Sequence, residues 1–278
     1  MTILVFTLIL LVGAYMAGFL GSLTGLGGGV IIIPLLTLVF HVDIRYAIGA
    51  ALLASIATSS GAASAYVKEG ITNIRLGMFL EIATTIGAVI GAFIAIYMPT
   101  NAIAVIFGVV LIFSAAMTVR KKHEAKLTKG SKLSEKLKLN STYPVNGEKV
   151  SYQLTNVAGG FSLMTLAGVL SGLLGIGSGS LKVLAMDSTM KIPFKVSTTT
   201  SNFMIGVTAA AASAVVYLQR GYMDPGIAFP VVLGVLAGAL TGAKILPKIN
   251  PKILRIIFAV AITAVAIEMI INGINHKF

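Results

Sequence analysis

Residues 25–29 read Gly-Leu-Gly-Gly-Gly, and residues 175–179 read Gly-Ile-Gly-Ser-Gly. Each cluster follows a long apolar stretch and precedes a second apolar run, so each interrupts what would otherwise be a continuous helix pattern. Glycine costs about 1 kcal/mol relative to alanine inside a helix, so a cluster of glycines indicates a break in the helix. This repeated break is the feature from which the fold can be predicted.

The composition is that of a membrane protein. Hydrophobic residues make up 56% of the 278-residue chain and charged residues 11%, and the mean hydropathy is +0.96. A soluble domain is about 25% charged, and helices need about 20 apolar residues to cross a bilayer. We therefore predict an all-α polytopic membrane protein. The chain has no cysteine, which excludes disulfides and thiolate metal sites.

The chain is an internal duplication. The two glycine motifs lie 150 positions apart, and Gly70 and Gly221 are separated by 151 positions. The same offset of 151 relates Gly87 and Gly91 to Gly238 and Gly242. We predict a first repeat at residues 1–119, a basic linker at 120–153 and a second repeat at 154–278. The linker is rich in Lys, Ser and Asn, so we expect it to be solvated, with a short helix near 131–139.

Each repeat is predicted to hold a broken or re-entrant helix pair followed by three transmembrane helices, about ten segments in all. The expected segments are 3–23, 30–40, 45–67, 75–98 and 101–119, then 155–174, 180–190, 196–218, 227–246 and 252–273. Whether the pair crosses twice or dips in and returns, the number of full crossings per repeat is odd. The second repeat therefore enters from the opposite side, which makes the repeats inverted.

Positive charge gathers on one set of loops and span ends: Lys68, Arg75, the Lys and Arg residues of 120–149, Lys191, Lys195, Lys244, Lys248, Lys252 and Arg255. The opposite set holds only Arg45, Arg220 and Lys277. The positive-inside rule then predicts a cytoplasmic linker and both termini outside, in the cell (inner) membrane. This topology accounts for the net charge of +12 without nucleic acid as a partner.

The glycine breaks are candidates for a binding site. Unwound backbone survives in a membrane only where protein or water surrounds it, and inverted-repeat transporters place such breaks at the midplane. The N-terminal end of each resumed helix carries about half a positive charge, which favours anions. The candidate residues in the two motifs are Gly25, Gly27, Gly28, Gly29, Gly175, Gly177, Ser178 and Gly179. The alternative is that these glycines only allow close helix packing, which is our interpretation of Gly87, Gly91, Gly238 and Gly242.

Polar side chains near the second motif extend this candidate site. Lys182 is a basic residue within an apolar segment, which indicates an anion-related role unless it snorkels to the interface. Thr200, Ser201 and Asn202 could donate hydrogen bonds to an anion or could join helices. Asp187 is a candidate for proton coupling and a possible partner of Lys182, whereas Glu81 and Glu268 could equally lie near interfaces. No cofactor, metal cluster or catalytic triad is predicted, so an enzyme is not expected.

The chain resembles the TauE/SafE family, also called the toluene sulfonate uptake permease family. The resemblance rests on the segments Gly25–Pro34, Gly175–Val183 and Ala47–Gly49 and on Thr200-Ser201, and it covers almost the whole chain outside the linker. It differs from the family pattern at Gly49-Ala50-Ala51, where Gly-Thr-Ser is common. Ser178 replaces a middle glycine, and Met186 stands where a proline like Pro34 would be expected. These differences shift the expected side-chain contacts to the second repeat.

The resemblance implies a secondary transporter, of the exporter type, for sulfite, sulfoacetate or other organosulfonates. It would work by alternating access around a midplane site, with protons as a possible coupling ion. The alternatives are a passive anion channel and a membrane-embedded accessory or sensor subunit that binds a partner through the linker.

Overall fold

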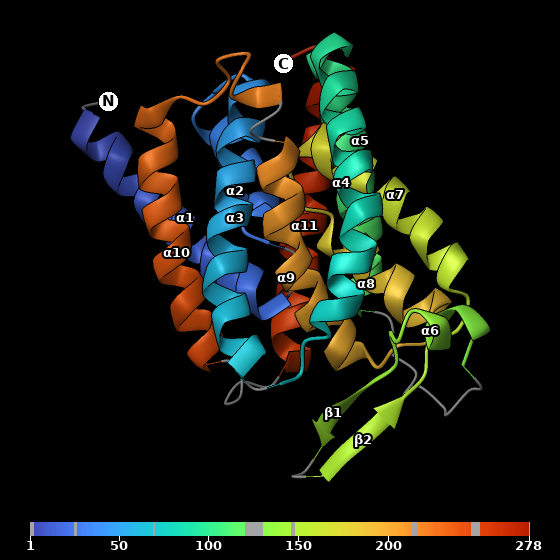
Figure 1. Cartoon of the computed structure of the whole chain (residues 1–278). Helices are drawn as coiled ribbons and strands as arrows, with labels where there is room; N and C mark the ends of the chain where they lie inside the picture. The colour runs from blue at the N-terminus through green and yellow to red at the C-terminus, as the bar shows by residue number, and fades with distance from the viewer. Residues whose placement is uncertain are drawn as a thin grey trace.

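The computed structural model describes residues 3–24, 27–68, 70–119, 130–145, 148–212, 216–245 and 251–277. Figure 1 shows a bundle of helices with a small β-hairpin projecting from one end. The first half contains α1 (Ile3–Thr24), α2 (Gly29–Pro34), the π-helical segment η1 (Leu35–Val39), α3 (Ile44–Lys68), α4 (Ile74–Tyr97) and α5 (Thr100–Val119). The second half contains α7 (Val157–Leu174), α8 (Gly179–Leu184), the π-helical segment η2 (Ala185–Thr189), α9 (Phe194–Ala212), α10 (Pro225–Ile245) and α11 (Pro251–Ile274).

Both broken helix pairs are re-entrant. The ring of Phe6, early in α1, lies 4.8 Å from the ring of Phe40, just after η1. In the second half, the amide of Thr155 donates to the carbonyl of Met190 at 3.0 Å, which joins the two ends of that pair. The returning limb in each half has 6 α-helical and 5 π-helical residues, or about 16 Å of helix. That is about half of the 30 Å hydrocarbon core, so each pair begins and ends on one side.

The two halves enter from opposite ends of the bundle, as predicted. Figure 1 places both chain termini at one end and the β-hairpin of the linker at the other. At the end with the termini, Asn101 Nδ2 lies 2.9 Å from His276 Nδ1. At the linker end, Asn73 Nδ2 donates to Tyr152 Oη at 2.8 Å. The all-α fold with inverted repeats is therefore confirmed.

The halves interlock through glycine faces. Helix α7 packs on α4 and α1 packs on α10, so the first helix of each half contacts the fourth helix of the other. A Cβ added to Gly87 or Gly91 would overlap the carbonyl oxygens of Thr165 and Val169 on α7. Gly238 and Gly242 approach the backbone of α1 in the same way. These four glycines permit close backbone contact, which confirms the packing interpretation.

Replacing Gly91 by valine should destabilise the fold. The added side chain would have to displace the carbonyl of Val169, which is backbone and cannot rotate away. Overpacking of this kind costs about 1–3 kcal/mol, so the midpoint of thermal unfolding in detergent should fall by several degrees. Ile90→Val is the matched control, because Ile90 is a neighbouring residue that is 46% exposed. An unchanged midpoint for Gly91→Val would contradict the packing interpretation.

The described part of the linker is more ordered than expected. The predicted short helix is present as α6 (Lys132–Lys136), but the chain also forms β1 (Ser141–Val145) and β2 (Glu148–Tyr152), paired antiparallel. Leu139, Tyr152 and Leu154 are buried in a cluster with residues of α4 and α7. Most of the described linker residues are nevertheless exposed or half-buried, and only Ser134, Leu139 and Tyr152 among them are buried. Residues 120–129 lie outside the described part.

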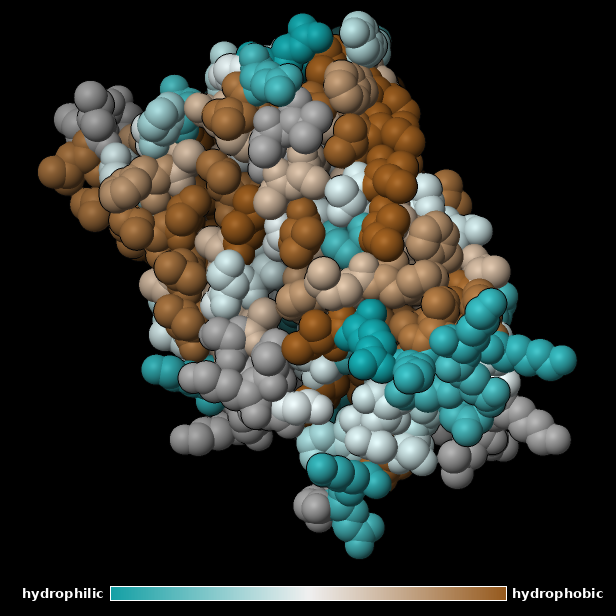
Figure 2. Space-filling model, viewed as in Figure 1, coloured by the Kyte–Doolittle hydropathy of each residue, from teal (hydrophilic) through white to brown (hydrophobic). Residues whose placement is uncertain are grey.

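The distribution of hydrophobic residues on the surface is that expected of a protein embedded in a bilayer. Figure 2 shows hydrophobic residues over the middle of the molecule and hydrophilic residues gathered at its two ends. Within the described residues, 5 helices are long and apolar enough to span a membrane: Leu4–Ser22, Ile44–Ala63, Ile74–Tyr97, Val157–Leu174 and Pro225–Lys244. Large apolar side chains on these helices, such as Ile82, Ile86 and Ile90 of α4, are exposed. The chain is therefore a polytopic membrane protein.

Candidate functional site

The two glycine motifs meet in the structure. A Cβ added to Gly29 would lie 2.8 Å from the carbonyl oxygen of Gly175 and 2.9 Å from Ser55 Oγ. At Gly27 the same atom would lie 3.8 Å from the carbonyl oxygen of Ile176. Each re-entrant pair thus turns against the other, beside the middle of α3. Gly25 lies outside the described residues.

Backbone conformation explains the small residues at each turn. Gly27 has φ +81° and Gly177 has φ +65°, a left-handed region that side chains strongly disfavour. Ser178 adopts the same region with φ 44°, and its hydroxyl donates to the carbonyl of Ala167 at 2.6 Å. That hydrogen bond ties the turn to α7. Ser178 therefore supports the backbone of the second break in this conformation.

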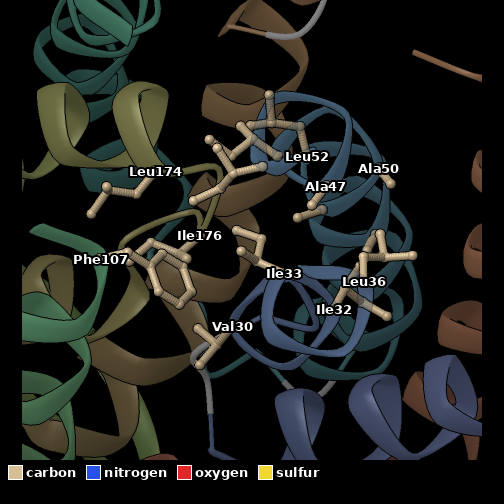
Figure 3. Packing of buried hydrophobic residues seen from close by; sticks show 14 of the residues in the cluster. Val30, Ile32, Ile33, Leu36, Ala47, Ala50, Leu52, Phe107, Leu174 and Ile176 are labelled. Carbon is tan, nitrogen blue, oxygen red and sulfur yellow. The ribbon is translucent and has the colours of Figure 1, made fainter. Parts of the chain in front are cut away.

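The apolar returning limb of the first half fills the space next to this meeting point. Figure 3 shows Val30, Ile32, Ile33 and Leu36 packed among residues of α3, with Phe107 of α5 and Ile176 of the second break nearby. All four side chains of the limb are buried. The first half therefore lines the centre with hydrocarbon on this side.

Two threonines at equivalent positions mark the difference between the halves. Thr58 of α3 and Thr208 of α9 are separated by 150 positions, the offset of the glycine motifs. Thr58 Oγ1 accepts from the amide of Gly28 at 3.1 Å and caps the start of α2. Thr208 Oγ1 instead accepts from Lys182 Nζ at 2.6 Å. In the first half the threonine hydroxyl therefore accepts a hydrogen bond from a backbone amide, and in the second half it accepts one from a charged side chain.

Lys182 belongs to a buried charged group that joins the two halves. Its side chain is 0% exposed, and Glu81 of α4 is 4% exposed. Thr208 bridges them, because its hydroxyl accepts from Lys182 and donates to Glu81 Oε1 at 2.5 Å. Thr85 Oγ1 also donates to Glu81 Oε1, at 3.3 Å. An unpaired charge in a membrane is costly, so each of the two charges stabilises the other.

The sequence prediction placed the acidic partner differently. Asp187, predicted as a possible partner of Lys182, lies half-buried in η2 on the same returning limb. The carboxylate reached through Thr208 is that of Glu81, which sequence spacing cannot place because it lies 101 positions earlier. Glu268 lies on the exposed face of α11. A solitary acid within the apolar run of α4 was the available signal for Glu81.

The polar cluster on α9 separates into different roles. Thr200 Oγ1 accepts from the amide of Asn73 at 3.1 Å, at the start of α4. Ser201 Oγ donates to the carbonyl of Gly179 at 3.2 Å, at the start of α8. The carbonyl of Asn202 accepts from Ser59 Oγ at 2.5 Å, while its side-chain amide nitrogen has no partner among the described residues. In this conformation Thr200 and Ser201 position helices, and Asn202 keeps a free donor.

Three buried polar atoms near the centre lack hydrogen-bond partners within the described residues. They are Ser55 Oγ, Asn202 Nδ2 and Glu81 Oε2. Ser55 and Asn202 are 0% and 1% exposed. Buried polar groups are nearly always paired, so unpaired ones indicate a ligand, water or a changing conformation. Among the described residues, no group of three or more His, Asp or Glu side chains is placed to hold a metal ion.

Comparison with known proteins agrees with this architecture. The sequence pattern of the family described as sulfite exporter TauE/SafE matches residues 9–269. The probable membrane transporter protein YunE of Bacillus subtilis is 31% identical over 233 residues, which cover 81% of this chain and 83% of that protein. The probable membrane transporter protein YdhB of the same organism is 26% identical over 222 residues, or 80% and 83% of the two chains. No solved structure gives a significant match.

The family match spans both re-entrant pairs and the helices that carry Lys182, Glu81 and Thr208. The two relatives also extend over most of the chain, so the likeness is not confined to one repeat. Both relatives are named as probable membrane transporters, which fits a membrane-embedded centre with unpaired polar groups. The chain therefore belongs to the TauE/SafE family, and it is a membrane transporter.

Proposed function

We propose that this protein is a secondary transporter of small sulfur-containing anions, such as sulfite, sulfoacetate or other organosulfonates. The observation that carries the proposal is the buried lysine beside the meeting point of the two glycine breaks. Glu81 balances the buried charge of Lys182 through Thr208 in this conformation, and an anionic substrate that replaced this contact would be an alternative counterpart for the same charge. The family description, sulfite exporter, supports a sulfur oxyanion as that counterpart and supports export as the direction.

The substrate would bind between the two re-entrant pairs. Gly25, Gly27, Gly28 and Gly29 from one side, and Gly175, Gly177 and Gly179 from the other, would let the anion approach the backbone closely. The free donors of Ser55 and Asn202 would bind oxygens of the substrate. Ser178, Thr200 and Ser201 would hold the surrounding backbone in place. Alternating access would follow from movement of one half against the other around this point.

We propose that the linker end faces the cytoplasm. Arg75, Lys138, Lys191 and Lys195 lie at that end and are exposed. The opposite end carries Arg45, Arg220 and Lys277, partly balanced by Asp43 and Asp224. Because the chain has no cysteine, single cysteines can report the topology. In intact cells, Lys277→Cys should react with a membrane-impermeant maleimide and Lys149→Cys should react only after lysis, and the reverse pattern would contradict the orientation.

Transport can be tested in proteoliposomes of the purified protein. We expect saturable movement of labelled sulfite or a sulfonate, with sulfate as a further test anion. Unlabelled substrate on the opposite side should accelerate the labelled flux, because a carrier exchanges substrate and a passive channel does not. Saturation without counterflow would support the channel. A protein that neither moves nor binds any anion of the panel would contradict the proposed substrate class and favour the accessory or sensor alternative.

A further inference from the structure

We propose that Glu81 takes up one proton for each monovalent anion transported, with Thr208 as the bridge between this carboxylate and Lys182. The inference rests on the proposed anion transport and adds its stoichiometry. It starts from the geometry of the three side chains. Lys182 Nζ, Thr208 Oγ1 and Glu81 Oε1 form one hydrogen-bonded chain, with distances of 2.6 Å and 2.5 Å.

The chain of hydrogen bonds leaves one carboxylate oxygen available. Glu81 Oε1 accepts from Thr208 and Thr85, whereas Oε2 is buried and has no partner within the described residues. A proton added at Oε2 would neutralise the carboxylate without breaking the bond between Thr208 and Oε1. Glu81 can therefore change its charge while the side chains around it stay in place.

Lys182 is the charge that Glu81 faces. Helix α7 packs against α4 and has no titratable residue, and the only titratable residue of α9 is Lys195, exposed near its start. The other charged residue of α4, Arg75, is exposed and donates to the carbonyl of Lys138. Asp187 lies half-buried on the returning limb.

Electroneutrality fixes the stoichiometry. Without substrate, protonated Lys182 and ionised Glu81 sum to zero charge. With a monovalent anion at Lys182, the sum returns to zero only if Glu81 binds one proton. A state with the anion alone or the proton alone would carry one net charge through the membrane interior, which is costly. Anion and proton binding therefore favour each other by the same factor, and they are carried together.

The direction of transport follows from the two gradients. A proton and an anion that move together respond to the pH gradient but carry no net charge, so the membrane potential does not drive them. Export then requires an outward anion gradient that exceeds the inward proton gradient. Such a gradient arises in a cell that produces the anion, which is compatible with export by this protein.

Glu81→Gln separates coupling from transport. Glutamine resembles the protonated carboxyl group, so the substrate-loaded form should still cross and counterflow should persist. The empty form would carry the unpaired charge of Lys182, so net flux driven by a pH gradient should fall roughly 100-fold. Glu268→Gln is the matched control, because Glu268 lies on the exposed face of α11, and it should leave both fluxes unchanged. The probe is labelled methanesulfonate, or sulfite if only sulfite is carried.

Three results would overturn the inference while leaving anion transport intact. In the first, Glu81→Gln accumulates the anion in response to a pH gradient at the wild-type rate. In the second, Glu81→Gln loses counterflow as well as net flux. In the third, Asp187→Asn loses the coupling to the pH gradient and Glu81→Gln keeps it. Absence of any flux in the wild-type protein would instead contradict the proposed function. Thr208→Ser should keep the coupling and Thr208→Val should weaken it, and equal behaviour of the two would count against the bridge.

A measurement on the wild-type protein avoids any effect of substitution on folding. Binding of methanesulfonate, which stays monovalent over the pH range of the experiment, should draw about one proton from the buffer per anion bound. Titration calorimetry in two buffers with different ionisation enthalpies gives this number directly. A value of zero in a protein that binds the anion would overturn the inference.

Discussion

Lys182→Met should weaken anion binding strongly while the protein still inserts and folds. The lysine is fully buried beside the meeting point of the two breaks, and methionine has similar length without charge. Removing one partner of a buried charged contact costs about 2–5 kcal/mol. Affinity should therefore fall roughly 30-fold or more, since about 1.4 kcal/mol corresponds to a factor of ten. Equilibrium binding of labelled sulfite to the purified protein measures this loss.

Two further variants distinguish lost binding from lost folding. Lys191→Met removes an exposed lysine just after the same returning limb, so it should leave affinity unchanged. The double variant Lys182→Met with Glu81→Gln removes both buried charges and should unfold at a higher temperature than Lys182→Met alone, because no unpaired carboxylate remains. The anion affinity of the double variant should stay as low as that of Lys182→Met. Wild-type affinity in Lys182→Met would assign the lysine a structural role only.

Gly29→Ala should reduce transport at least tenfold. Its Cβ would lie 2.8 Å from the carbonyl oxygen of Gly175, 2.9 Å from Ser55 Oγ and 3.0 Å from the carbonyl oxygen of Ala51. Two of these atoms are backbone from different elements, so a single methyl group must push the re-entrant pairs apart. Overpacking of this size costs about 1–3 kcal/mol, which a stable bundle can tolerate while the central geometry is lost.

Gly61→Ala is the matched control for Gly29→Ala. Gly61 also lies in a buried helix contact, against α10. An added Cβ would lie 3.2 Å from Ala239 Cβ, and the nearest backbone atom, the nitrogen of Leu240, would be 3.6 Å away. We expect transport near the wild-type rate in this variant. Initial rates of counterflow, normalised to folded protein by size-exclusion chromatography, provide the comparison. Equal rates for Gly29→Ala and wild type would contradict the proposed role of the meeting point.

Much of the fold could be predicted because the sequence is an internal duplication, so the same pattern of segments can be recognised in both halves. Two glycine motifs at one offset indicate a duplication, and an odd number of crossings per repeat indicates inversion. The β-hairpin at 141–152 could not be predicted, because its strands are short and polar and contain Pro144. Its stability comes from Leu139, Tyr152 and Leu154, which pack on the ends of α4 and α7, a contact that local patterns do not reveal.

The candidate site was only partly predictable for a related reason. Lys182 and the glycines are conspicuous within their own segments, so local sequence finds them. Glu81 and Thr208 become part of the site only because α4 of one half packs against α9 of the other, which brings their side chains into contact. Ser55 likewise matters because the first break folds back against α3. The resulting site is asymmetric. The first re-entrant pair contributes backbone and apolar side chains, whereas the second contributes Lys182, which is linked to Glu81 through Thr208.

Ser55→Cys tests the central claim, that an anion binds where the two breaks meet. The chain has no native cysteine, so an anionic methanethiosulfonate reagent reports on this position alone. Ser60→Cys, one turn further along α3 and exposed, is the control. We predict that modification of Cys at position 55 blocks transport and that saturating methanesulfonate slows it, while the control responds to neither. A modification rate that is independent of the anion, or full transport after modification, would contradict the account.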